Sequence, residues 1–541
     1  MKKEICGNII DIHNRRIFKG CISIIDGIIA SITECENDSD QFILPGFVDA
    51  HVHIESSMLI PSEFARLAVV HGTVGTISDP HEIANVLGVQ GVEFMIQNAQ
   101  KVPLKIYFGV PSCVPATIFE TAGAEINAED VKYLFEKYDL AYLAEMMNFP
   151  GVLARDPLVM EKIQIARDFG KPTDGHAPGL MGDLAEKYIS AGISTDHECF
   201  TEEEALSKLQ LGMKILIREG SAAKNFEALI PLAKQYSANI MFCSDDKHPD
   251  NLVEGHINTL VKRALAKGIE LFDILQMACL NPVQHYAMKV GLLRVGDPAD
   301  FIVIDDPKQF HILETYIDGT LVAQNGKTNI PKVSEEPINN FNISPIHQKD
   351  LAAPASSSKI KVIEALDGQL ITNSLVADAK IEDGNYVSDT ENDVLKMVCV
   401  NRYSDAPVAI AFIKNFGLKH GAIASSVAHD SHNIIAVGTD DDSMAKAINL
   451  IIEARGGISL SSHTHQEILP LPVGGLMSAD DGYKIAERYS HIDQLAKSHG
   501  STLKSPFMSL SFMALLVIPH LKLSDKGLFD GDTFQFTSIT A

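Results

Sequence analysis

Between Leu44 and about Val290 the chain alternates apolar strand candidates with helix candidates, and this alternation limits the possible folds more than any other feature. Strand–helix alternation predicts a parallel sheet with helices packed on it. About eight such units in about 250 residues predict a closed (β/α)8 barrel of the TIM type rather than an open sheet. The clearest strand candidates are residues 47–53, 74–78, 105–110, 141–146, 192–197 and 240–244, and helix candidates include 61–71, 128–138, 201–212 and 252–267.

The segments on either side of the barrel are expected to pair with each other. Residues 22–25 and 28–32 are strand-like runs split by Asp26-Gly27, a hairpin signal, and residues 301–304 form a similar run. We therefore expect one small β-sandwich domain from residues 1–44 and 291–335, around a barrel of residues 45–290. A Pro/Ser-rich stretch at 336–359 is typical of a linker, and residues 360–541 are expected to form a C-terminal mixed α/β domain.

Composition restricts the partners of this protein. The 541 residues carry a formal net charge of −25, which disfavours binding to nucleic acid or to anionic membranes. The eight cysteines are scattered without a CxxC pair, a pattern that favours reduced thiols in a cytoplasm over a disulfide framework or structural zinc. The N-terminal residues contain no uninterrupted apolar run as long as that of a signal peptide, and the most apolar later stretch is too short to span a membrane. We expect a cytoplasmic protein, with a homodimer compatible with its size and type.

The strongest local motif is Leu44-Pro-Gly-Phe-Val-Asp-Ala-His-Val-His53. Side chains of a strand alternate between its two faces, so His51 and His53 point the same way. At the C-terminal end of an inward-facing barrel strand they can share one metal ion, because neutral imidazoles bind zinc, iron, cobalt or manganese. Two surface histidines on an edge strand are the alternative.

Ligand-type residues also end later strand candidates: Glu145, His176, His197, Asp245 and Asp246. Singly, each has an ordinary interpretation as a loop residue or a helix cap. Together they place four histidines and several carboxylates at the same ends of successive strands, where barrel enzymes hold their catalytic groups. The set therefore predicts a metal centre at that end of the barrel.

On these residues the sequence resembles the amidohydrolase superfamily over residues 1 to about 330. Within it the whole chain resembles the adenine deaminase family. The matching segments are Pro-Gly-Phe-Val-Asp-Ala-His-Val-His-Ile-Glu-Ser-Ser (45–57), Gly-Thr-Val-Gly-Thr-Ile-Ser-Asp-Pro-His-Glu-Ile-Ala-Asn (72–85), Ala-Glu-Met-Met-Asn-Phe-Pro-Gly-Val (144–152), Asp-Gly-His-Ala-Pro-Gly-Leu (174–180), Thr-Asp-His-Glu (195–198), Ser-Asp-Asp (244–246), His-Asp-Ser-His-Asn (429–433) and Leu-Pro-Leu-Pro-Val-Gly-Gly-Leu-Met-Ser (469–478).

The resemblance implies hydrolysis of adenine to hypoxanthine and ammonia by a metal-bound hydroxide. It implies two divalent metal ions, commonly manganese or iron. His51, His53 and Asp245 would hold one ion, His176 and His197 the other, and Glu145 would bridge them. Many members of the superfamily bridge with a carboxylated lysine instead, and Glu145 at this strand end favours the deaminase family. Asp245 would also shuttle a proton, which suits a carboxylate whose pKa is raised toward neutrality.

Residues near this motif are candidates for contacting the purine base. A donor near the ring nitrogens would help attack, and Asp79, His81 and Glu82 are candidates for this role. Asp79 and Glu82 also suit a helix cap. Glu55 and Asp246 are further candidates for substrate contact, and a surface-loop position is as good an interpretation of Glu55.

Several alternatives stay open. His429, Asp430 and His432 are consistent with a further metal site, although a turn with satisfied side chains is slightly favoured. Another amidohydrolase reaction on a cyclic amide and a non-catalytic barrel scaffold are the alternative functions. A zinc cytidine deaminase is disfavoured, because His53-Ile-Glu55 matches H-x-E but no P-C-x-x-C follows.

Overall fold

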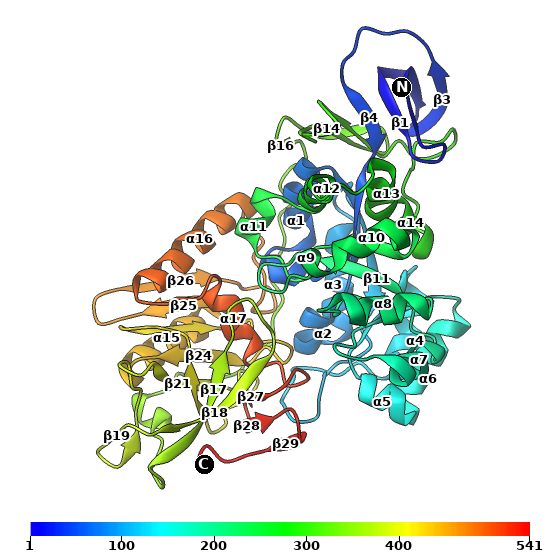
Figure 1. Cartoon of the computed structure of the whole chain (residues 1–541). Coiled ribbons are helices and arrows are strands. Elements are labelled where there is room, and N and C mark those ends of the chain that lie inside the picture. Colours follow the sequence, from blue (N-terminus) through cyan, green and yellow to red (C-terminus); the bar gives the residue numbers. More distant parts are fainter. Residues whose placement is uncertain (1) are drawn as a thin grey trace.

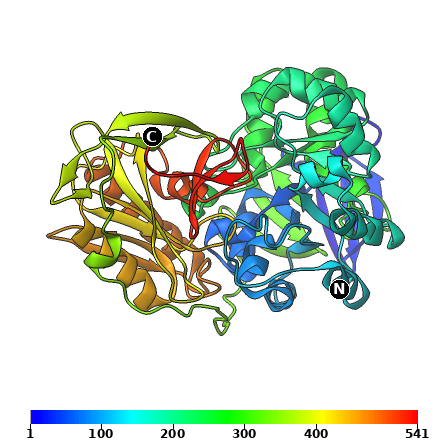
Figure 2. The ribbon, with the colours of Figure 1, turned by 90° about the horizontal axis from the view of Figure 1, so that it is seen from below.

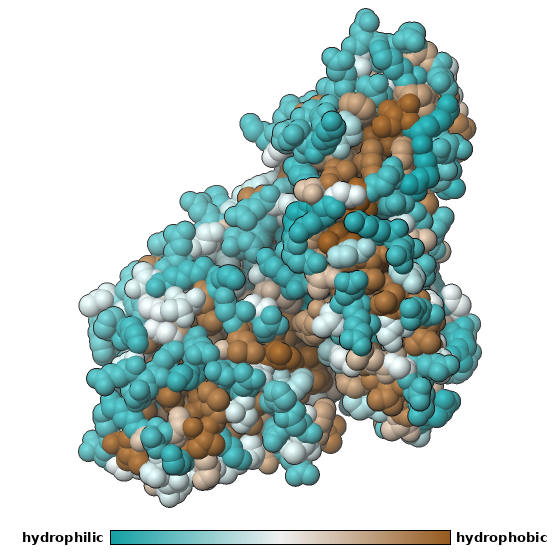
Figure 3. Space-filling model, in the orientation of Figure 1, coloured by the Kyte–Doolittle hydropathy of each residue, from teal (hydrophilic) through white to brown (hydrophobic). Residues whose placement is uncertain are grey.

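The computed structural model describes residues 2–541 and shows two lobes joined side by side (Figures 1 and 2). One lobe contains a barrel with a small β domain at one end, and the other contains the C-terminal domain, drawn in yellow to red in Figure 2. Much of the face in Figure 3 is hydrophilic. In the described residues, no helix is long and apolar enough to cross a membrane.

The barrel consists of eight parallel strands that follow one another in chain order. Parallel pairing joins β5 through β9 and β10 through β12. A bridge from Thr173 to Ile193 connects the two groups, and a bridge from Val52 to Asp245 closes the ring. The predicted closed barrel is confirmed. Its strands are β5 (Phe47–Val52), β6 (Thr73–Ser78), β7 (Lys105–Val110), β8 (Tyr142–Met146), β9 (Thr173–Gly175), β10 (Thr195–Asp196), β11 (Lys214–Arg218) and β12 (Ile240–Cys243).

Helices surround these strands, and their starts follow local capping chemistry. Asn127 and Asp130 form a reciprocal capping box at α4, and the Thr201 hydroxyl caps α8. The barrel helices are α1 (Pro61–Ala68), α2 (His81–Leu87), α3 (Val89–Ala99), α4 (Ala128–Lys137), α5 (Phe149–Ala154), α6 (Pro157–Asp168), α7 (Gly182–Ser190), α8 (Glu202–Gln210), α9 (Phe226–Leu229), α10 (Ala233–Tyr236), α11 (Pro249–Glu254), α12 (Ile257–Ala266), α13 (Leu271–Leu275) and α14 (Asn281–His285).

The small β domain joins both flanks of the barrel in one eight-stranded sheet of order β16-β15-β14-β13-β4-β1-β2-β3. Strand β4 pairs with β1 on one side and β13 on the other, so it connects the flanks. Asp26 and Gly27 form the predicted turn with φ of 50° and 82°, values that suit a tight hairpin. The strands are β1 (Lys2–Asp11), β2 (Arg16–Ile25), β3 (Ile28–Glu34), β4 (Phe42–Pro45), β13 (Phe301–Ile304), β14 (Ile312–Ile317), β15 (Thr320–Gln324) and β16 (Lys327–Thr328).

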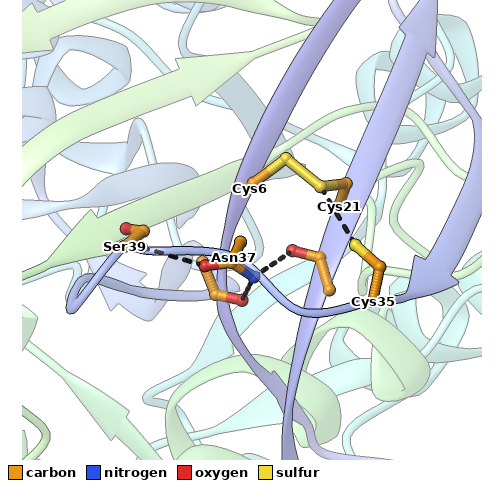
Figure 4. The surroundings of a disulfide bond; sticks show 7 residues. Cys6, Cys21, Cys35, Asn37 and Ser39 are labelled. Atoms are coloured by element: carbon orange, nitrogen blue, oxygen red, sulfur yellow. Dashed lines mark hydrogen bonds between the residues drawn. A yellow bond between two sulfur atoms is a disulfide. The ribbon is translucent and has the colours of Figure 1, made fainter.

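Two of the eight cysteines form a disulfide, so the expectation that the thiols are all reduced is wrong for this pair. Cys6 and Cys21 lie directly opposite each other in the β1–β2 register, with their Cα atoms 4.0 Å apart. The hairpin brings them together although 15 positions separate them in sequence. Figure 4 shows the Cys35 thiol beside them, its Sγ 3.4 Å from Cys21 Sγ.

The C-terminal domain is the predicted mixed α/β unit. Its sheet has the order β18-β17-β22-β21-β24-β23-β25-β26, with the helices α15 (Asp441–Ala454), α16 (Gly482–Ser498) and α17 (Pro506–Phe512). The sheet strands are β17 (Lys359–Ala365), β18 (Thr372–Asp378), β21 (Val394–Val400), β22 (Ala409–Lys414), β23 (Ala422–Ser425), β24 (Ile434–Gly438), β25 (Gly457–Ser461) and β26 (Gln466–Pro470). A separate hairpin contains β19 (Ile381–Glu382) and β20 (Asn385–Tyr386), and a three-stranded sheet contains β27 (Leu521–Ser524), β28 (Gly527–Asp530) and β29 (Gln535–Phe536).

The stretch expected to be a linker packs against this domain. Phe341, Ile346 and Leu351 are buried in one apolar cluster with side chains of α15. The residue limits that the sequence analysis gives for the individual domains stay predictions. The two lobes also contact each other directly, since Arg66 of α1 pairs with Asp481 at the start of α16 and Gly482 N donates to Glu63. These contacts hold the C-terminal domain against the barrel.

Candidate metal centre

Two histidines and an aspartate converge at the point where the barrel closes. His51 lies in β5 and His53 directly follows it, and their Nε2 atoms are 3.1 Å apart. Asp245, after β12, brings Oδ1 within 3.5 Å of His51 Nε2 and 3.4 Å of His53 Nε2. All three side chains are buried. They form one compact group of nitrogen and oxygen donors.

A second group lies beside the first and shares Glu145 with it. Glu145 Oε2 is 2.7 Å from His176 Nδ1 and 3.1 Å from His197 Nε2. Its other oxygen, Oε1, is 3.4 Å from His53 Nε2 in the first group. The carboxylate of Glu145 therefore spans the two groups, and the structure brings together all six residues that the sequence proposed as ligands.

The distances fit a metal centre. Ligands ~2.1 Å from one ion and separated by angles of roughly 90–110° lie about 3.0–3.4 Å from each other. The His51–His53 and His197–Glu145 separations fall in this range, and those to Asp245 are close to it. Two imidazole nitrogens that face each other share only one proton in a hydrogen bond. A bound metal ion therefore explains the convergence of these buried groups better than hydrogen bonds among them do. Nitrogen and carboxylate donors suit manganese, iron or zinc.

Arg218 and Glu198 are part of this site, and the sequence interpretation missed them. Arg218, the last residue of β11, donates from Nη1 to Asp245 Oδ2 at 2.8 Å and from Nη2 to Glu198 Oε2 at 2.9 Å. Both residues fit the pattern that identified the other candidates, a polar residue at the end of a strand, since Arg218 ends an apolar strand and Glu198 follows His197. Burial would raise the pKa of Asp245, but the Arg218 guanidinium and hydrogen bonds from His51 and His53 hold it well below its usual range. This is opposite to the raised pKa that the sequence interpretation preferred for a proton shuttle.

Asp79 and His81 border the first group. Asp79 Oδ2 is 3.1 Å from His81 Nδ1, and the same nitrogen is 3.5 Å from Glu145 Oε1. Asp79 Oδ1 also accepts from the His81 backbone N–H at 3.0 Å. The aspartate therefore orients the imidazole at the start of α2, and His81 Nε2 faces away from it, toward Glu82 and Asp430.

Glu82 connects the barrel to the C-terminal domain. Its Oε1 is 2.6 Å from His429 Nδ1, and its Oε2 contacts His432 Nε2. Burial would raise the pKa of Glu82, but the two histidines hold it well below its usual range. His429 and His432 therefore reach across the domain boundary, and this differs from the locally satisfied turn that the sequence favoured.

The last two candidates for substrate contact, Asp246 and Glu55, differ in their position relative to the cavity beside the metal centre. Asp246 lines the cavity beside the metal centre and accepts a hydrogen bond from the Ser56 hydroxyl at 2.5 Å. Burial, together with the neighbouring Asp245 carboxylate, raises its pKa. The Glu55 carboxylate instead accepts from the Ile83 backbone N–H at 3.3 Å and is not among the residues that line this cavity. Burial raises the pKa of Glu55 to about 7.

The cavity lies between the barrel and the C-terminal domain. Its volume is about 20 Å³, enough for one or two waters when each needs roughly 10–15 Å³. The barrel side carries the groups described above. The C-terminal side consists of Leu370, His429, Asp430, Phe512 and Leu515, of which only His429 and Asp430 drew attention in the sequence.

A closed parallel barrel with a histidine and carboxylate cluster at the C-terminal ends of its strands defines a metal-dependent hydrolase of the amidohydrolase type. The Amidohydrolase family model matches residues 42–322, and the model of the adenine deaminase C-terminal domain matches residues 369–535. The chain belongs to the adenine deaminase family.

Full-length relatives agree with this assignment. An adenine deaminase of Methanosarcina mazei is 53% identical over 552 residues, covering 100% of both chains. One from Salinibacter ruber is 53% identical and covers 98% of each chain, and one from Sulfurovum sp. is 54% identical and covers 98% of this chain and 99% of its own. The similarity therefore includes the C-terminal domain as well as the barrel.

Proposed function

We propose that this protein hydrolyses adenine to hypoxanthine and ammonia. The proposal rests on the buried group of four histidines, Glu145 and Asp245 at the mouth of the barrel. It is supported by the similarity of the chain, over its full length, to proteins named adenine deaminase. In the reaction water adds to the ring carbon that carries the amino group. The carbon–nitrogen bond then breaks, and a proton from the water leaves with the nitrogen as ammonia.

The six ligand candidates would hold two divalent cations, manganese or iron, with Glu145 between them. Such cations supply a hydroxide nucleophile near neutral pH, where free water is a poor one. The protein's own contribution is to hold its donors in place before the substrate arrives. Arg218 fixes one oxygen of Asp245 and leaves the other facing His51 and His53.

Asp245 is the proposed proton shuttle. Its Oδ1, the oxygen that faces His51 and His53, is the atom that would accept a proton from the attacking water. His81, oriented by Asp79, is the proposed donor to a ring nitrogen of the base as negative charge develops there. Glu82 and Asp246 line the same cavity and are proposed to accept hydrogen bonds from the base. Glu55 is proposed to act more indirectly, through its hydrogen bond to α2.

The test is to express the protein with added manganese, limit iron uptake, and follow the ultraviolet spectrum of adenine together with ammonia release. Conversion to hypoxanthine that is lost in His51→Ala and in Asp245→Asn supports both the substrate and the ligand roles. Turnover of hydantoins, dihydropyrimidines or imidazolones above adenine would reverse the assignment. A metal content near zero in careful preparations would favour the scaffold alternative.

The wider role is proposed on the same basis. A purine base substrate places the enzyme in purine salvage or catabolism. A homodimer, a cytoplasmic location and the absence of nucleic acid or membrane partners stay predictions from the sequence.

A further inference from the structure

We propose that His429 and His432 of the C-terminal domain are positioning residues that hold the carboxylate of Glu82 for the substrate. This inference rests on the proposed deamination and adds to it a role for the second domain. It explains why a barrel enzyme whose ligands all come from residues 51–245 keeps a large additional domain against its active site.

The contacts on Glu82 are the first support. Each carboxylate oxygen faces a different histidine, since His429 Nδ1 is 2.6 Å from Oε1 and His432 Nε2 contacts Oε2. All three side chains are buried. A carboxylate with a histidine against each oxygen has little room to rotate, so the C-terminal domain restricts the direction of its remaining lone pairs.

The local structure of the loop between β23 and β24 is the second support. His432 has φ of 56°, a left-handed conformation that costs a non-glycine residue free energy. The surrounding contacts maintain it, because Asn433 donates to the Thr121 carbonyl at 3.0 Å and Tyr403 donates to the Ser431 carbonyl at 2.6 Å. The loop is thus fixed both within its own domain and to the barrel.

The shape of the cavity is the third support. The Phe512 ring stacks on the His429 imidazole at 5.1 Å between centroids, and Phe512 and Leu515 line the cavity beside it. The base would therefore meet an apolar surface and the Glu82 carboxylate in one place. The free space between these side chains is smaller than a purine, so the side chains that line the cavity would have to move apart to admit the base.

Conservative variants distinguish a positioning role of the two histidines from a general contribution to the stability of the fold. His429 uses Nδ1 and His432 uses Nε2, so His429→Asn and His432→Gln keep a nitrogen near each carboxylate oxygen, whereas His429→Ala and His432→Ala remove it. We expect each alanine variant to lower kcat/KM for adenine by about 10- to 100-fold, mainly through KM, with the bound metal unchanged. The asparagine and glutamine variants should recover most of this loss. His420→Ala, at an exposed position of the same domain, is the matched control and should behave as the wild type.

A double-mutant cycle tests whether the histidines act through Glu82. In a Glu82→Gln background, His432→Ala should cause little further loss, because the group that it positions has already been changed. The inference would be overturned if the losses in kcat/KM multiplied across the cycle, or if the conservative variants were as impaired as the alanine variants. In either case the wild type would still deaminate adenine, so the proposed function would stand. A metal-loaded wild type that does not deaminate adenine would overturn the proposed function, and with it the inference.

Discussion

Arg218 offers a direct test of how the candidate centre is built. Its guanidinium lies between two carboxylates, and the side chains of Arg218, Glu198 and Asp245 are 1%, 1% and 3% exposed. Replacement by methionine keeps an apolar side chain of similar length but leaves both carboxylates buried without their counter-charge. Removing one partner of a buried ion pair costs about 3–5 kcal/mol. Hydrogen bonds to charged groups are worth roughly 1.5–3 kcal/mol each, so Arg218→Lys, which keeps the charge but not the planar fork, should lose less.

The functional effect follows from the contact to Asp245. Groups that orient metal ligands typically change metal affinity or activity by about 10- to 100-fold when they are removed. We expect Arg218→Met to lower manganese affinity and kcat/KM by that factor and to lower the urea midpoint for loss of helical circular dichroism. Arg263→Met, which breaks a more exposed pair with Glu219 and Glu227, is the control and should change little. If Arg218→Met bound manganese and deaminated adenine as well as the control, the ion pair would have no role in holding Asp245.

Three further predictions concern the scaffold. Gly46→Ala should destabilise the barrel by about 1–3 kcal/mol, because its Cβ would lie 2.2 Å from Val74 Cγ1; an unchanged thermal midpoint would contradict this. Burial lowers the pKa of His248 to about 3, so the unfolded chain binds a proton that the folded chain excludes between pH 6.5 and 3. The free energy of unfolding should therefore fall on acidification by up to about 1.4 kcal/mol per pH unit, and His248→Asn should reduce this slope in denaturation curves of the metal-free protein at pH 6.5 and pH 5. Alkylation of the unfolded chain without reductant should label six cysteines and leave the Cys6–Cys21 pair unlabelled, and labelling of all eight would refute the disulfide.

Local sequence pattern predicted the barrel and the ligand-type residues at its strand ends, and the family resemblance selected six of these residues as ligand candidates. The period of two in β5 aligns His51 with His53, and parallel strands bring the residues that follow them to one edge. The pattern was weakest at β9, which spans only Thr173–Gly175, too few residues for a period to show, and the expected strand at 192–197 is longer than the observed β10 (Thr195–Asp196). His176 and His197 could still be found, because each is a ligand-type residue next to such a strand.

Three features depended on the tertiary structure alone. The Glu82–His429 contact joins residues 347 positions apart, and no local periodicity encodes a pairing at that distance. Cys6 and Cys21 meet because the hairpin register places them opposite each other, which spacing alone did not reveal. Arg218 could be recognised as a strand end, but its pairing with both Glu198 and Asp245 requires β11, β12 and the end of β10 to be adjacent. The sequence thus determined which chemical groups the protein carries at its strand ends, whereas packing of distant segments decided which of those groups hold one another.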